Sequence, residues 1–177
     1  MKNRKFNFVQ ILENARQGLY TKAQIKKLMK AADEFGMSSV VRDLSLYLTP
    51  ATEFAGDSAP EAIKERVAKG VSYLNAQGHS LSRTKQMLKR HGIIESINRV
   101  GARPGISKNL EVLAKAGLLQ YSAESIVIDY PQLFSQRVVD MAKTKMQKMT
   151  DPTYQKVKSI LHGLVQECEI SLGQECA

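Results

Sequence analysis

Short amphipathic segments that end at glycine recur along the chain, and this pattern most constrains what the chain can fold into. Apolar residues in these segments repeat at the three-to-four-residue spacing of one helix face. Glycine readily adopts the left-handed backbone conformation that ends a helix. We therefore expect helix ends near Gly18, Gly36, Gly78, Gly92, Gly101 and Gly117. The pattern predicts an all-α protein, compact and built of nine or ten short helices.

Residues that cap helix N-termini precede many of these segments. Thr21 with Gln24 and Ser58 with Glu61 have the spacing of capping boxes, in which side chain and backbone exchange hydrogen bonds. Pro60 lies in the first turn of the second of these helices, where a missing N–H costs nothing. Further N-caps are predicted at Ser38, Ser107, Ser122 and Ser135, and Asp151 with Pro152 is predicted to begin a long C-terminal helix.

One segment competes as a β-strand. Residues 125–130 (SIVIDY) are rich in β-branched side chains and follow a helical pattern, which is the helix-then-wing order of a winged helix. Ser122 and Glu124 favour a helix start, and no partner strand is visible in the sequence. Because an isolated strand is not stable, the helix is favoured.

The chain of 177 residues suits one domain, or one domain with a small helical appendage. We expect a three-helix N-terminal unit at 1–48, followed by a linker at 49–60 that contains two prolines and a glycine. A larger, basic helical domain is predicted at 61–150, and a long C-terminal helix with a tail at 151–177.

Positive charge is concentrated in one part of the chain. Residues 64–108 contain ten Lys and Arg against two Glu, so they carry +8 of the net charge of +9. Wound as a helix, the segment 80–92 places Leu81, Thr84, Met87, Leu88 and His91 within an arc of about 120°. Four cations and no anion lie outside that arc, whereas solvated helix faces normally mix the two signs.

These cations predict a surface that holds the phosphate backbone of DNA or RNA. Arg103 lies on a turn between Gly101 and Gly105, both able to take positive φ, which lets the backbone approach a ligand. Lys108 follows the predicted Ser107 cap, whose free N–H groups suit a phosphate. The candidate nucleic-acid-binding residues are Arg83, Lys85, Lys89, Arg90, Arg99, Arg103 and Lys108.

Catalytic and cofactor motifs are not found in the sequence. His79, His91 and His162 have no second ligand at metal-binding spacing, and no phosphate-binding glycine loop is present. Acidic residues do not cluster, and Cys168 and Cys176 are read as free thiols. We therefore expect a protein that is not an enzyme and uses no metal or cofactor.

From Gly78 to about Met146 the chain resembles a group of small, uncharacterised bacterial proteins found near mobile-element and DNA-modification or defence genes. The shared landmarks are helix ends, helix starts and core positions: Met87, Leu88 and Gly92; Leu113, Gly117 and Leu118; Ser122 and Glu124; Pro131, Leu133 and Phe134. The resemblance implies a shared helical fold and favours nucleic-acid work, and it supplies no catalytic residues.

Three alternatives stay open beside backbone binding. The basic face suits docking on an acidic partner protein, as a regulator or inhibitor would use it. The apolar stripe of the C-terminal helix suits homodimer formation. A helix-turn-helix that reads the major groove is a further possibility, although the turn after Gly92 is very short. No secretory signal or membrane-spanning run is visible, so a cytoplasmic location is expected.

Overall fold

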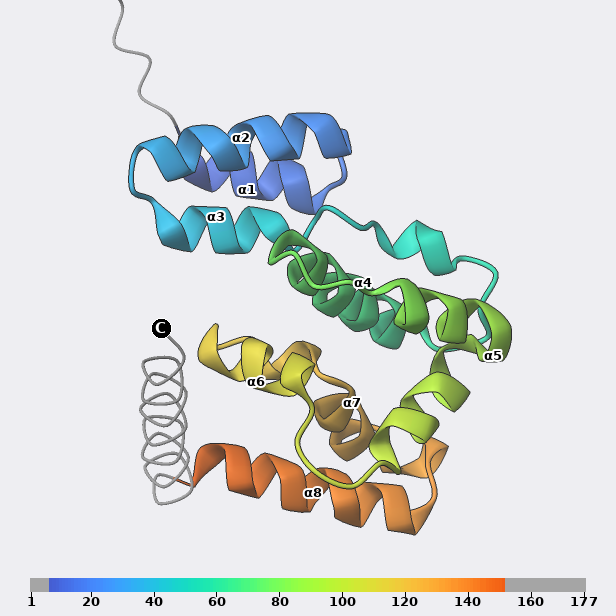
Figure 1. The fold of residues 1–177 in the computed structure, drawn as a ribbon. Helices are drawn as coiled ribbons and strands as arrows, with labels where there is room; N and C mark the ends of the chain where they lie inside the picture. Colours follow the sequence, from blue (N-terminus) through green and yellow to red (C-terminus); the bar gives the residue numbers. More distant parts are fainter. Residues whose placement is uncertain (1–6, 152–177) are drawn as a thin grey trace, which may run out of the picture.

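The computed structural model describes residues 7–151, and these form eight α-helices and three short 3₁₀ helices (Figure 1). The elements are α1 (Phe8–Arg16), α2 (Lys22–Glu34), α3 (Ser38–Ser45), η1 (Ala51–Phe54), α4 (Glu61–Ala76), α5 (Ser82–Gly101), α6 (Lys108–Lys115), η2 (Leu119–Tyr121), α7 (Ala123–Asp129), η3 (Pro131–Leu133) and α8 (Gln136–Thr150). No strand occurs among these residues, so the predicted all-α class is confirmed. The predicted C-terminal helix from Pro152 onward, His162 and both cysteines lie outside the described residues.

The first three helices pack on one another as a small unit with its own buried cluster (Figure 1). The predicted capping box at the start of α2 is present. Thr21 N donates to Gln24 Oε1 over 2.8 Å, and Gln24 N donates to Thr21 Oγ1 over 3.3 Å. Ile25 and Leu44, which are 2% and 1% exposed, lie at the centre of the cluster.

Helix α4 is the central element of the larger part of the structure. Its predicted apolar stripe of Ile63, Val67, Val71 and Leu74 is buried, and it packs against side chains from α5, α6, α7 and α8. Ser122 Oγ accepts from Ser125 N over 3.1 Å and caps α7 as predicted. Residues 125–129 of the segment that competed as a strand therefore lie in α7, where Ile126 and Val127 are buried.

The segment 49–60, expected to be a linker, is packed against α4 over part of its length. Thr49 N donates to Ser72 Oγ over 2.8 Å, and Ser72 Oγ donates to Ser45 O over 2.8 Å. Thr49, Ser72 and Ser45 are all buried. This chain of hydrogen bonds joins the end of α3 to the middle of α4, because buried polar groups need partners.

Helix α5 is broken at Gly92 rather than ended there. Gly92 has φ 72° and ψ 172°, and helical geometry resumes at the next residue. Ile93 N donates to Asp57 Oδ2 over 2.8 Å, while Asp57 Oδ1 accepts from Ala59 N over 2.8 Å. Asp57 thus acts as an N-cap, supplied from a distant segment, for the second half of α5.

Several local predictions are wrong. The Ser58–Glu61 capping box does not form, because the turn held by Asp57 delays the helix start to Glu61, and Glu61 instead pairs with Lys64. The N-cap of α3 is Met37 rather than Ser38. Ser135 does occupy the predicted N-cap of α8, although its side chain makes no capping hydrogen bond.

The two glycines of the turn after α5 differ in role. Gly105 has a positive φ of 80°, as expected, whereas Gly101 remains helical as the last residue of α5. A Cβ on Gly101 would lie 2.7 Å from Val138 Cγ1, so glycine is needed there for the close approach of α5 to α8.

Two substitutions of Asp57 distinguish the loss of its hydrogen-bond-accepting oxygens from a change that keeps the size of the side chain. We expect Asp57→Ala to lower the free energy of unfolding by about 1–2 kcal/mol, because Ile93 N and Ala59 N both lose their acceptor. Asp57→Asn keeps one side-chain oxygen and should lose less. Urea unfolding of both variants measures the difference, and equal losses would contradict the capping role.

Gly70→Ala should destabilise the protein although Gly70 lies inside a helix, where alanine is normally favoured by about 1 kcal/mol. A Cβ at position 70 would lie 2.6 Å from Tyr121 O, a backbone atom. Overpacking of this kind costs about 1–3 kcal/mol. Gly56→Ala is the matched control, because nothing lies within 4 Å of its Cβ position and its φ is not positive. A neutral Gly70→Ala measured by urea unfolding would contradict the close packing of α4 against η2.

Candidate binding surfaces: a basic helix face and a cavity

The first half of α5 presents its cations to solvent. Arg83, Lys85, Lys89 and Arg90 are all exposed, and none forms an ion pair with any of residues 7–151. Leu81 and Leu88 are buried, as their side of the helix predicts. His91, which was assigned to the apolar arc, is exposed because the break at Gly92 follows it immediately.

The four cations occupy two flanks of the exposed face. At about 100° per residue, Arg83 and Arg90 are about 20° apart and Lys85 and Lys89 about 40° apart, and the centres of the two pairs are about 130° apart. Arg83 lines a cavity that Arg103 also lines, from the turn after α5. Lys85 and Lys89 line a different hollow, which also contains Glu53 and Asp57. Arg83 and Arg103 therefore line one cavity, and the two lysines line another hollow.

The remaining predicted site residues differ in whether another side chain already binds them. Arg99 Nε donates to Glu95 Oε1 over 2.7 Å, and its Nη1 lies 3.1 Å from His91 Nε2. Hydrogen bonds from Arg99 and then from Asn98 lower the pKa of Glu95. Lys108 is exposed at the first residue of α6, directly after Ser107, whose Oγ accepts from Leu110 N over 3.1 Å as predicted.

Three other cations of the basic segment stabilise the fold. Arg66 binds Asp129 Oδ2 at 2.6 Å and also donates to Gln120 O, which ties α4 to η2 and α7. Lys69 pairs with Glu65 at 2.6 Å and lies over the rings of Tyr47 and Tyr121. The buried Lys64 pairs with Glu61 at 2.8 Å. The local charge excess therefore overstates the cations that are available to a partner.

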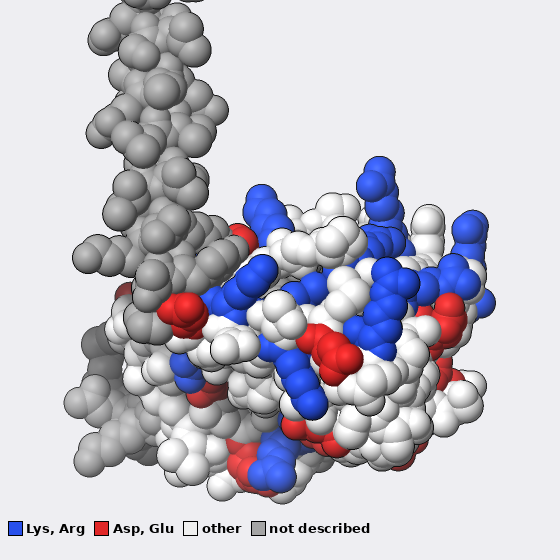
Figure 2. Space-filling model, turned by 90° about the horizontal axis from the view of Figure 1, so that it is seen from below, with Lys and Arg blue, Asp and Glu red and all other residues white. Residues whose placement is uncertain are grey.

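Figure 2 shows the molecule from the side of α8. Lys and Arg side chains project over the upper half of this view, and Asp and Glu side chains are interspersed among them. This side of the surface is thus of mixed sign. The first half of α5 differs from this side of the surface, because its cations follow one another along the chain with no anion between them.

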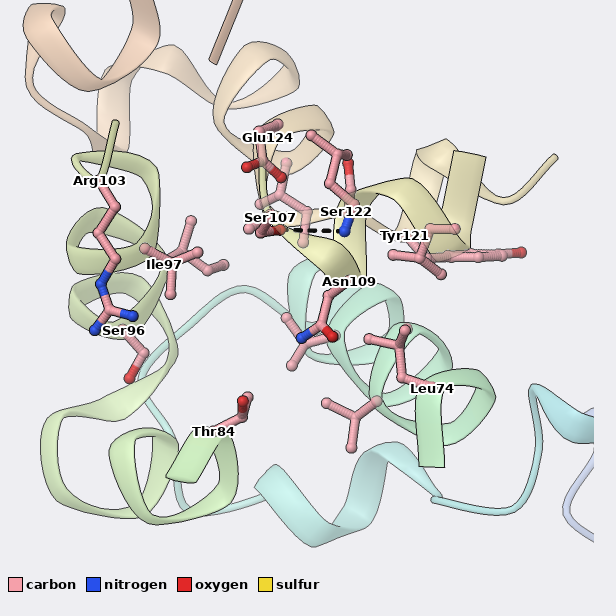
Figure 3. A pocket seen from close by; sticks show the side chains of 18 of the residues that line it. Leu74, Thr84, Ser96, Ile97, Arg103, Ser107, Asn109, Tyr121, Ser122 and Glu124 are labelled. Carbon is pink, nitrogen blue, oxygen red and sulfur yellow. Dashed lines mark hydrogen bonds between the residues drawn. The ribbon is translucent and has the colours of Figure 1, made fainter. Parts of the chain in front are cut away.

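A cavity of about 560 Å³ lies between α4, α5, α6 and α7 (Figure 3). Most of its wall is apolar, as in Val71, Ile97 and Leu110. Asn109 and Thr84 add polar groups from α6 and α5, and both point toward the space between these helices in Figure 3. This volume lies within the range of small-molecule sites, which are mainly apolar with a few converging polar groups.

A buried ion pair lies in the wall of this cavity. Lys145 Nζ is 3.6 Å from Glu124 Oε1, and the two side chains are 7% and 3% exposed. Lys145 Nζ also donates to Gly101 O over 3.1 Å. Glu124 Oε1 and Ser96 Oγ are buried and have no hydrogen-bond partner among the described residues. Charged residues are almost never fully buried without a partner, and unpaired buried atoms are rare.

Sequence reasoning did not identify this pair or the cavity. Glu124 was interpreted as a helix-start residue, and Lys145 was not singled out. The two residues lie on different helices, and no periodic or spacing signal links them. One signal was available: Lys145 falls on the same side of α8 as the buried Val138 and Ala142, which indicates a buried lysine.

No group of three or more His, Cys, Asp or Glu residues within 7–151 could hold a metal ion. No helix in the same part of the chain is long and apolar enough to cross a bilayer. Comparisons with protein-family models, with curated proteins and with solved structures find no match to this chain.

Removing one partner of the buried pair should cost far more than removing both. Lys145→Met leaves the Glu124 carboxylate buried without its cation, which should lower the free energy of unfolding by about 3–5 kcal/mol. The double variant Lys145→Met, Glu124→Leu removes both charges and should recover a large part of that loss. Chemical denaturation of the two variants is the measurement, and a double variant no more stable than the single one would contradict the pairing.

Proposed function

We propose that this protein binds the phosphate backbone of nucleic acid, without catalysis, through the first half of α5. The observation that carries the proposal is the set of four exposed cations, Arg83, Lys85, Lys89 and Arg90, which form no ion pair with a described residue. Cations that form no internal ion pair are available to phosphates, and each bound phosphate releases condensed counterions.

The distribution of the cations favours backbone contact over base reading. They lie on the two flanks of the exposed face, and only Ser82 and Gln86 lie between them. A helix about 10–12 Å across that carries cations on both flanks can reach phosphates on either side of a groove about 12 Å wide. Two short polar side chains offer few contacts to base edges, so weak sequence dependence follows.

Arg103 adds a cation to this surface because it lines the same cavity as Arg83. Lys108 is exposed and adds a cation at the N-terminus of α6. Arg99 contributes less, because its guanidinium already binds Glu95. Residues 78–146 resemble small bacterial proteins found near mobile-element and defence genes. The proposal therefore includes a role in mobile-element or defence biology.

Salt titration of binding to duplex DNA and duplex RNA tests the proposal. Contact with four or five phosphates implies a slope of log K against log salt of roughly −4 on duplex DNA. Arg83→Ala with Arg90→Ala should flatten the slope by about 2 and weaken all sequences alike, and so should Lys85→Ala with Lys89→Ala. The fold should survive, because none of the four side chains is buried.

The matched control is Lys26→Ala with Lys27→Ala on α2, which makes the same change in net charge at exposed positions outside the basic segment. It should leave the slope unchanged. If the control flattens the slope as much as the α5 pairs do, binding is a net-charge effect. If the wild-type protein shows no micromolar binding at low salt, the basic face is better explained as a docking surface for an acidic partner protein.

A further inference from the structure

We propose that the cavity between α4, α5, α6 and α7 binds a small organic anion with an apolar body and a hydrogen-bond-donating group. The proposal rests on three features of one cavity: its apolar wall, its buried polar atoms without a hydrogen-bond partner and the two arginines that line it. It does not depend on nucleic-acid binding.

The wall selects an apolar body. Helix α4 contributes Val67, Val71 and Leu74, and α5 and α6 contribute Ile97 and Leu110. The break at Gly92 turns the second half of α5 away from the direction of the first half, so the two halves line the cavity separately, through Arg83 and Thr84 and through Ser96 and Ile97. A volume of about 560 Å³ accommodates a ligand of two or three fused or linked rings.

Buried polar atoms in the wall select a hydrogen-bond donor. Glu124, 2% exposed, has an Oε1 atom that lies 3.6 Å from Lys145 Nζ and has no hydrogen-bond partner among the described residues, and its carboxylate can only accept. Ser96, 1% exposed, lines the same cavity, and its Oγ is likewise unpaired. Buried polar atoms of this kind cost free energy in the empty protein. A ligand N–H or O–H would satisfy them.

The open end selects an anion. Arg83 and Arg103 both line the cavity and both are exposed, so they lie where it meets solvent. In Figure 3 the Arg103 side chain runs back along α5. Neither arginine forms an ion pair with a described residue. Guanidinium groups bind carboxylates, sulfonates and phosphates through paired N–H donors, and they keep their charge at all physiological pH values.

Two matched fluorescent probes test the proposal on the full-length protein. 1-Anilinonaphthalene-8-sulfonate has an apolar body, an N–H donor and an anion, and N-phenyl-1-naphthylamine is the same molecule without the sulfonate. We expect one molecule of the sulfonate probe to bind per chain with a micromolar dissociation constant, and the uncharged probe to bind about tenfold more weakly. Titration calorimetry and fluorescence enhancement measure both.

Variants assign the binding to the cavity. Arg83→Ala with Arg103→Ala should weaken the sulfonate probe about tenfold and leave the uncharged probe unchanged, because only the sulfonate contacts arginine. Lys85→Ala with Lys89→Ala makes the same charge change at the neighbouring hollow and should affect neither probe. Val100→Trp, or Asn109→Phe as an independent second variant, should fill the space and abolish binding of both.

Ser96→Ala separates a ligand contact from a structural one. The Ser96 hydroxyl is buried and unpaired, so its removal should raise the midpoint of urea unfolding while it weakens both probes. A purely structural serine would move stability and leave the affinities alone. The proposal is overturned if neither probe binds at about 100 µM, or if binding persists unchanged in the folded cavity-filling variants, which would indicate adsorption elsewhere on the surface.

Discussion

The carboxylate of Asp57 accepts hydrogen bonds of 2.8 Å from Ala59 N and from Ile93 N, and so holds the segment before α4 against the break in α5. Both contacts satisfy backbone N–H groups that a helix start or a turn leaves without a partner. Gly92 makes the arrangement possible, because its φ of 72° is one that glycine adopts at little cost. A Cβ at this position would also lie 3.1 Å from Asp57 Oδ2.

Both candidate surfaces depend on this break. An unbroken α5 would be one straight helix of 20 residues, in which the faces of the first and second halves could not point in independent directions. The break instead lets the first half expose its cations while the second half directs Ile97 and Ser96 toward the cavity. Helix α8 then closes the far side, with Gly101 against Val138 and Lys145 Nζ bonded to Gly101 O.

Local signals predicted most of the helices because their causes are local. The capping box of Thr21 and Gln24 and the caps by Ser107 and Ser122 are interactions between residues three apart, and sequence shows them directly. The Ser58–Glu61 box does not form although its spacing is correct, since Asp57 holds a turn there and also caps Ile93, 36 positions away.

The cavity and its ion pair are harder still to predict from the sequence, because they form where four or five elements meet. Glu124 and Lys145 become neighbours only when α7 packs on α8. The basic residues were correctly placed on the exposed side of α5. Their division into two flanks with different neighbours required the structure, since it is Glu53 and Asp57 from residues 49–60 that lie beside Lys85 and Lys89.

Arg83 belongs to both surfaces, and this sharing has a thermodynamic consequence. It is one of the four cations of the proposed backbone contact, and with Arg103 it lines the cavity. A guanidinium that binds the anion of a cavity ligand is no longer free for a phosphate, so the two ligands would oppose each other through Arg83. By linkage the opposition is mutual: nucleic acid would weaken the small anion by the same factor. Lys85 and Lys89 lie at the other hollow, outside this competition, so the opposition would reduce nucleic-acid binding without abolishing it.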